Sequence, residues 1–194
     1  TCGVFLAVML ESTGLPWFIV IIMCFALGIG FGLFNAFLVN DLGFQSFIAT
    51  LATGSFIAKG LTYVIANGKT VAIKDPVVLF VGTYKIGKYV PVAIIISLVA
   101  ITIYGIILAK TKFGRSIYLS GGNRAAARLA GINPKRLSYI LFANSGFLGA
   151  LAGILLAGRL KSGNVNGTNN YTFTAITAVI LGGISFGGGS GGML

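Results

Sequence analysis

The sequence predicts an all-α fold, a polytopic transmembrane helical bundle, and three observations support this prediction. Hydrophobic residues make up 56% of the 194 residues. Charged residues make up only 9%, whereas soluble domains carry roughly 25%. Several apolar stretches reach the length of about 20 residues that a helix needs to cross a bilayer core of about 30 Å. A soluble fold of this size has too little interior for so much apolar surface, so lipid is the expected solvent.

Four stretches are long enough to span, and we place them at 17–38, 44–66, 89–109 and 137–158. A fifth apolar stretch at 171–186 is short, which favours a broken or re-entrant segment. We expect residues 1–194 to form a single membrane domain. Since the chain starts without Met and stops after a glycine cluster, we interpret it as an internal fragment of a longer chain.

The residues that most metal sites and acid–base enzymes require are scarce. Histidine is absent, and the only acidic residues are Glu11, Asp41 and Asp75. We therefore expect no catalytic residue, no metal and no cofactor. Cys2 and Cys24 lie in apolar stretches and are interpreted as small core residues rather than a disulfide.

Basic residues indicate the orientation in the membrane. Seven of them and no acid lie in the loop 110–136, which should therefore be cytoplasmic; they are Lys110, Lys112, Arg115, Arg124, Arg128, Lys135 and Arg136. Six others fall in the loops 67–88 and 159–170, which lie outside if successive spans alternate in direction. The excess of basic residues on the cytoplasmic side is therefore small. The net charge of +11 is interpreted as topology and attraction to anionic lipid rather than nucleic-acid binding.

Small residues recur every four positions on two of the predicted spans. One row is Gly28, Gly32 and Ala36, and the other is Ser145, Gly149, Gly153 and Ala157. Such rows let a second helix approach closely. Close packing within the chain, a subunit interface and a pore-facing surface all stay open.

Within the loop 110–136, the sequence predicts a short helix of about two turns. Asn123 can cap its start and Gly131 can end it. Ala125, Ala126 and Leu129 share one face, and Arg124 and Arg128 share another. This helix is too short to span the membrane, and it either inserts into a partner's groove or lies on the bilayer surface.

Lys59 is the one charge in the predicted span 44–66. An ammonium group buried in lipid is costly and indicates function. Because Lys59 lies seven residues from Ala66, its side chain could instead reach the membrane interface.

With these segments in place, the chain resembles the permease subunit of bacterial ABC importers for sugars, of the ribose/xylose/autoinducer-2 type. The resemblance covers nearly the whole chain, and its most specific part is the central motif around Gly121-Gly122-Asn123. The matching residues are Phe47–Leu51, Lys59-Gly60, Gly114-Arg115, Ile117-Tyr118, Gly121–Asn123, Ala125-Ala126, Arg128-Leu129, Gly131-Ile132, Ala178–Gly183, Ser185 and Gly187-Gly188.

The resemblance implies that the short helix is a coupling helix that docks on an ATPase subunit. The residues implied in this contact are Gly122, Asn123, Arg124, Ala125, Ala126, Arg128, Leu129 and Gly131. It also implies ABC ATPase subunits, a periplasmic or extracellular solute-binding protein and a second permease subunit, identical or homologous, as partners. The cargo would be a small polar solute such as a monosaccharide, and the location the bacterial inner membrane.

The chain departs from the family pattern at several positions. The family's Gly-Ile-Asp-Leu-Ser-Val-Gly motif would lie before Thr1, and Arg124, Thr172 and Thr174 stand where acidic residues are common. These departures leave the substrate-binding residues unassigned. An ion-coupled secondary transporter, or a membrane scaffold held by the glycine rows, remains the alternative.

Overall fold

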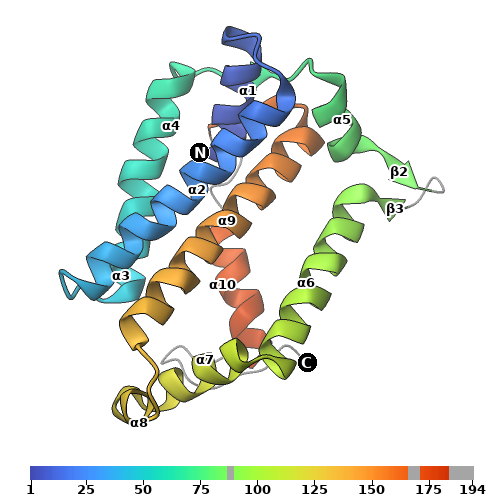
Figure 1. Ribbon diagram of the computed structural model, residues 1–194. Coiled ribbons are helices and arrows are strands. Elements are labelled where there is room, and N and C mark those ends of the chain that lie inside the picture. The colour runs from blue at the N-terminus through green and yellow to red at the C-terminus, as the bar shows by residue number, and fades with distance from the viewer. Residues whose placement is uncertain (87–89, 166–170, 184–194) are drawn as a thin grey trace. The chain divides into compact units, whose positions relative to one another are not determined.

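The computed structural model describes residues 1–86, 90–165 and 171–183 (Figure 1). The chain separates into two compact units. Unit 1 comprises residues 1–95 and 138–167, and unit 2 comprises residues 96–137 and 168–194. Gly187–Gly189, Ser185 and the end of the predicted segment 171–186 lie outside the described residues.

Unit 1 contains most of the apolar helices. These are α1 (Cys2–Ser12), α2 (Trp17–Asn40), α3 (Ser46–Ala52), the π-helix η1 (Thr53–Ala58), α4 (Lys59–Ala66), α5 (Pro76–Thr83) and all but the first turn of α9 (Pro134–Leu160). The core forms where α1, α2 and α9 meet. Leu6, Val20 and Cys24 are fully buried there. Both cysteines are free and buried, as predicted.

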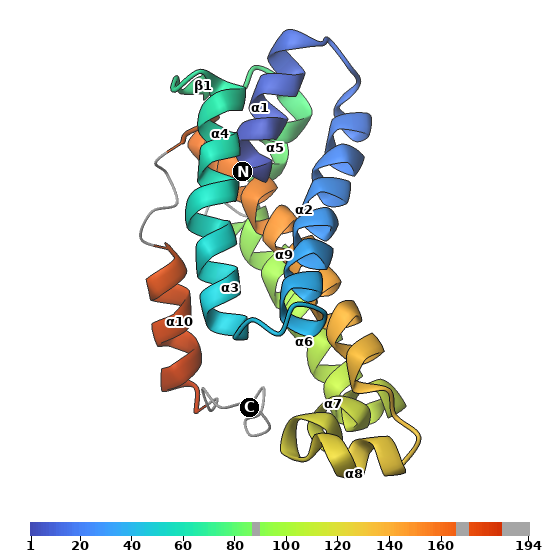
Figure 2. The ribbon, with the colours of Figure 1, turned by 90° about the vertical axis from the view of Figure 1, so that its left-hand side faces the viewer.

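The predicted span 44–66 is a single helical segment with an irregular turn inside it. Figure 2 shows α3 and α4 following each other as one rod, and η1 lies between them. Thr53 at the start of η1 donates to the Asn35 side chain of α2 at 2.6 Å. The Ala58 carbonyl at its end accepts hydroxyl bonds from Thr1 at 2.9 Å and Thr62 at 2.6 Å. Hydroxyl contacts therefore fix both ends of η1.

Two short antiparallel strand pairs connect loops of unit 1. β1 (Val71–Ala72) pairs with β4 (Ser162–Gly163), and β2 (Lys85–Ile86) pairs with β3 (Val90–Pro91). The first pairing joins the loop after α4 to the loop after α9, so both loops lie at one end of unit 1. Alternation of the predicted spans places these two loops on the same, outer side of the membrane.

Unit 2 contains most of α6 (Val92–Lys110), then α7 (Lys112–Gly122), α8 (Arg124–Leu129), the first turn of α9 and α10 (Tyr171–Leu181). Neither α6 nor α10 has a buried residue. Their apolar side chains are thus available to lipid or to another chain.

The prediction of an all-α bundle is confirmed. Four helical segments are long and apolar enough to cross a membrane: Trp17–Asn40, Ser46–Ala66, Val92–Lys110 and Pro134–Leu160. They coincide with the four predicted spans. At 171–186 the structure has an 11-residue helix, α10, and a re-entrant path stays a prediction. The predicted loops contain two unforeseen helices, α5 and α7.

Candidate functional site

The basic segment of unit 2 begins where α6 turns into α7. The Thr111 side chain caps α7 by accepting from the Gly114 backbone N–H at 3.1 Å. Gly114 packs against the Leu108 backbone so closely that no Cβ fits there. The glycine therefore lets α7 start directly beside the end of α6.

Asn123 connects α7 to α8. It lies in an extended conformation, with φ −151° and ψ 107°, between the two helices. Its side-chain oxygen accepts from the backbone N–H groups of Ala125 at 2.9 Å and Ala126 at 3.1 Å. These bonds satisfy two donors that a helix start otherwise leaves free. Asn123 thus caps α8 as the sequence analysis expected.

The end of α8 also follows the expected chemistry. Gly131 has a φ of +77°, which favours glycine. Its N–H donates to the Arg128 carbonyl, and the Ile132 N–H donates to the Ala127 carbonyl, each at 3.0 Å. A second asparagine, Asn133, then caps α9 by accepting from the N–H groups of Lys135 and Arg136 at 3.1 Å.

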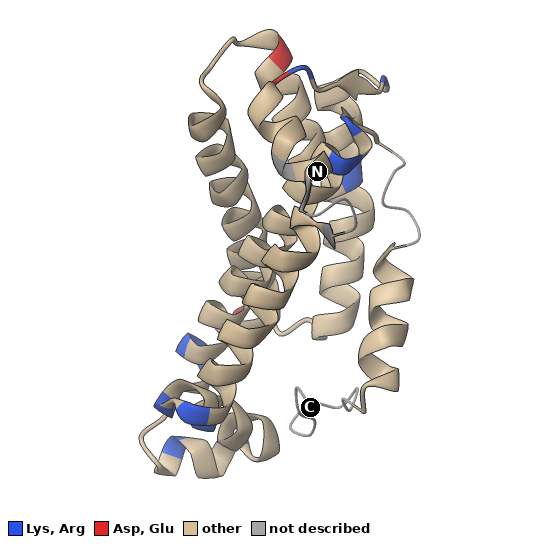
Figure 3. Cartoon of the chain, turned by 90° about the vertical axis from the view of Figure 1, so that its right-hand side faces the viewer, with Lys and Arg blue, Asp and Glu red and all other residues tan. Residues whose placement is uncertain are grey.

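Most of α8 is open to its surroundings. Ala127 is only 1% exposed, whereas Leu129 is 92% exposed. Gly122, Arg124, Ala125, Ala126 and Arg128 are exposed as well. Figure 3 shows the basic residues of α7, α8 and the first turn of α9 close together. The segment therefore presents small apolar side chains and one large one beside positive charge, and its role in docking stays a prediction.

The predicted helix-packing glycines of α2 lie against α9 within unit 1. A Cβ added at Gly28 would come within 2.5 Å of the Gly146 carbonyl oxygen. One added at Gly32 would collide with the Phe142 carbonyl. The neighbouring rings of Phe25 and Phe147 stack with centroids 4.5 Å apart. Here the backbones approach as closely as small residues allow.

On α9 the contacts include Gly153 and Ala157 of the predicted row, but not Gly149. A Cβ added at Gly153 would come within 3.3 Å of the Gly3 backbone N, but a Cβ at Gly149 would meet no heavy atom within 4 Å. Gly149 therefore lies away from the described helix contacts, and its packing role stays a prediction. Gly146 and Ala150 contact Gly28 instead.

The spacing of small residues could have identified the correct face of α9. A helix turns about 100° per residue, so each step of four residues drifts by roughly 40°. Residues separated by successive spacings of four, three and four positions stay on nearly the same side of the helix. Gly146, Ala150, Gly153 and Ala157 have those spacings, and they lie near α1 or α2.

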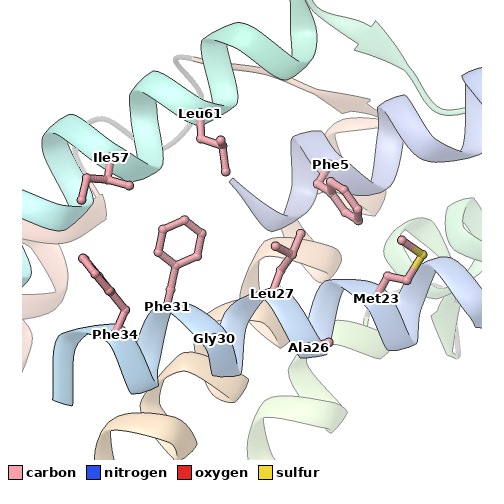
Figure 4. A pocket seen from close by; sticks show the side chains of 9 residues that line it. All are labelled: Phe5, Met23, Ala26, Leu27, Gly30, Phe31, Phe34, Ile57 and Leu61. Atoms are coloured by element: carbon pink, nitrogen blue, oxygen red, sulfur yellow. The ribbon is translucent and has the colours of Figure 1, made fainter. Parts of the chain in front are cut away.

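Unit 1 also contains an apolar groove of about 580 Å³ (Figure 4). Its lining comes from α1, α2, η1 and α4, and consists of Phe5, Met23, Ala26, Leu27, Gly30, Phe31, Phe34, Ile57 and Leu61. None of these side chains offers a strong hydrogen bond. The groove suits an acyl chain or an apolar side chain rather than a polar solute.

Neither a metal site nor an acid–base site emerges from the part of the chain that the structure describes. No group of three His, Cys, Asp or Glu side chains could hold a metal ion among those residues. The Tyr139 hydroxyl of α9 donates to the Asp41 carboxylate at 2.5 Å.

Comparison with known proteins gives consistent relatives. The family model described as "Branched-chain amino acid transport system / permease component" matches residues 1–193. The L-arabinose transport system permease protein AraH of Escherichia coli is 40% identical over 157 residues, which are 81% of this chain and 47% of that protein. The ribose import permease protein RbsC of Haemophilus influenzae is 39% identical over 191 residues, 96% of this chain and 58% of that protein.

The fructose import permease protein FruG of Bifidobacterium longum is 32% identical over 194 residues, 95% of this chain and 57% of that protein. The chain thus spans about half the length of these curated relatives. No solved structure matches it. The match of residues 1–193 to the family model, together with four helices able to cross a membrane, shows that the chain is a multi-pass membrane protein of the family of branched-chain amino acid transport system permease components.

Proposed function

We propose that the chain is the membrane-spanning part of a permease subunit in an ATP-binding-cassette importer for a small polar solute, in the bacterial inner membrane. The observation that supports this most is the similarity over nearly the whole chain to permeases named for arabinose, ribose and fructose. A monosaccharide is therefore the proposed cargo. The subunit itself performs no bond chemistry.

The proposed mechanism assigns α8 to coupling. Partner ATPase subunits bind and hydrolyse ATP on the cytoplasmic side, where the basic segment 110–136 lies. Their closure moves α8, and the membrane helices change between inward-open and outward-open states. A second permease subunit completes the path, and an external solute-binding protein delivers the solute.

The exposure pattern of α8 fits this role. A docking helix needs side chains that a partner can cover and an inner side that holds the helix on its own chain. Ala127 supplies the inner contact and Leu129 the outward one. Leu129 would otherwise leave a large apolar side chain in the aqueous or interfacial region, which costs free energy.

The test is crosslinking from α8 in the full-length protein in native membranes. A cysteine replaces exposed Ala126, and a short reagent reactive with thiols and amines captures its neighbour for mass spectrometry. We expect a P-loop ATPase, with a yield that changes when ATP is added.

Ala127→Cys is the matched control, because position 127 is buried and should give little product. The wild-type protein reports the background from buried Cys2 and Cys24. If position 126 is accessible and uptake proceeds without capture of an ATPase, the coupling role fails. An ion-driven transporter then becomes the better explanation.

A further inference from the structure

Three polar side chains follow one side of the segment formed by α3, η1 and α4. Ser55, Lys59 and Tyr63 are spaced four residues apart, close to one helical turn. All three are exposed, and Tyr63 retains 60% of its surface. We call Ser55, Lys59 and Tyr63 the polar stripe.

The polar stripe is separate from the face that packs within unit 1. Thr53 and Thr62 are each 4% exposed, and they bond toward α2 and α1, respectively. Ile57 and Leu61 line the apolar groove. The stripe therefore has no role in the contacts that hold this segment on its own unit.

Exposed apolar side chains lie next to the stripe on the same helix. Phe56 is 80% exposed and Val64 is 70% exposed, as expected for side chains that face lipid. An ammonium group beside hydrocarbon is costly, and polar residues in spanning helices usually face a water-filled cavity or another polar group. Snorkelling could account for Lys59 alone, because Ala66 is roughly 10 Å away along the helix.

Snorkelling does not account for Ser55, which lies near the middle of the 21-residue segment Ser46–Ala66. Hydroxyls in membrane helices commonly donate to the carbonyl four residues earlier. Thr50 and Thr62 do so at 2.9 and 2.6 Å. Within the described part of the chain, the Ser55 hydroxyl makes no hydrogen bond and the Lys59 ammonium has no partner. Both groups are free to bind something outside unit 1.

We propose that the polar stripe lines the water-filled solute path and donates hydrogen bonds to a hydroxyl-bearing solute. A hydroxyl, an ammonium and a phenol together supply several donors to oxygen atoms. The Tyr63 ring adds an apolar face for the C–H groups of a sugar ring. This assignment rests on the proposed import function and identifies part of its solute contact.

The first test measures water access along the helix in the full-length transporter, assembled with its ATPase and solute-binding protein. Cysteines are placed singly at positions 55, 59 and 63, and a charged, membrane-impermeant methanethiosulfonate reagent is applied. Val64→Cys is the matched control on the same helix, because Val64 is exposed and lies about half a turn around the helix from Ser55. We expect the stripe positions to react at least ten times faster than this control.

Solute protection tests the binding part of the proposal. D-ribose, L-arabinose and D-fructose are each added during labelling, and at least one should slow the reaction at position 59. Equal rates at stripe and control positions would overturn the proposal. Spontaneous disulfides between two copies at position 59 would also overturn it, because the stripe would then be a subunit interface.

Uptake kinetics separate a solute contact from a structural role. Lys59→Met should raise the KM of uptake about tenfold without lowering the amount of protein in the membrane, and Lys59→Arg should restore it. If wild-type complex imports sugar but Lys59→Met has an unchanged KM, the stripe proposal fails and the import function stands. If the wild type imports none of the three sugars, these sugars fail as the proposed cargo, and the labelling pattern still decides whether the stripe faces water.

Discussion

In unit 1, α2 and α9 approach so closely that carbonyl oxygens of α9 occupy the space where side chains of α2 would begin. In unit 2, α8 has one buried side chain, Ala127, and its start is stabilised by a single asparagine. The α2–α9 contact depends on glycines that have no side chain. The start of α8 depends on the side chain of Asn123. The two regions should therefore respond to different substitutions.

The difference suits the work proposed for each region. Helices joined through their backbones resist sliding, because the packed atoms have no flexible side chain that can move aside. A six-residue helix is below the length that is stable alone in water, so a partner's contact has a large influence on it. We expect unit 1 to set the stability of the fold and α8 to set its response to the ATPase.

The largest effect is expected from a methyl group at the α2–α9 contact. In Gly32→Ala the new Cβ would strike the Phe142 carbonyl, a backbone group that cannot rotate away. Overpacking of this kind costs about 1–3 kcal/mol, so the Tm of the purified protein in detergent should fall. Gly30→Ala is the control on the same helix, since nothing lies within 4 Å of its Cβ. Equal Tm values for the two variants would contradict the close contact.

An intermediate effect is expected from removing the cap of α8. Asn123→Ala should cost about 0.5–2 kcal/mol of helix stability, and six residues offer little to replace it. Hydrogen exchange at the amides of residues 125 and 126 should accelerate, and ATP-dependent uptake should fall several-fold. Asn123→Ser keeps an acceptor and should preserve both.

Asn133→Ala is the matched comparison, because Asn133 caps the 27-residue helix α9 with the same bond pattern. The long helix should retain its structure, with exchange increased only at its first amides. Equal losses of uptake in Asn123→Ala and Asn133→Ala would argue against a special sensitivity of α8.

The smallest effect is expected at the end of the α2–α9 contact. Tyr139→Phe removes the hydrogen bond from the tyrosine hydroxyl to the exposed Asp41 carboxylate. Such a bond contributes about 0.5–1.5 kcal/mol, so the Tm should fall less than in Gly32→Ala. Tyr118→Phe, which loses no hydrogen bond seen in the structure, is the control. A larger loss in Tyr139→Phe than in Gly32→Ala would reverse the order of importance proposed here.

The sequence predicted the long helices and α8 because their signals are local. Uninterrupted apolar length identifies the spans, and Asn123 with Gly131 marks both ends of α8. The same kind of local signal is present at α5. Asp75 accepts from the N–H groups of Val77 and Val78, and Pro76 begins the helix. The apolar run after Pro76 is too short to predict a span, so this helix falls within the predicted loop 67–88.

Features that depend on two distant segments were harder to predict. Gly146 and Ala150 contact α2, and Gly149 does not, because of the side of α9 that faces α2. A row of small residues at four-residue spacing does not by itself identify that side. The π-helix has no composition signal in Thr53–Ala58. Its existence depends on contacts with Asn35 and Thr1, which lie far from it in the sequence.

The π-helix has a mechanical consequence for the residues that follow it. A π-turn closes its hydrogen bonds over one residue more than an α-turn. Rewinding Thr53–Ala58 into a regular α-helix would therefore shift α4 by one residue, a rotation of about 100° around the helix axis. Thr62 would then leave the face that packs within unit 1, and the side chain of Lys59 would move around the helix axis by the same angle. The hydrogen bonds from Thr1 and Thr62 to the Ala58 carbonyl therefore oppose rotation of α4 about its own axis relative to α3.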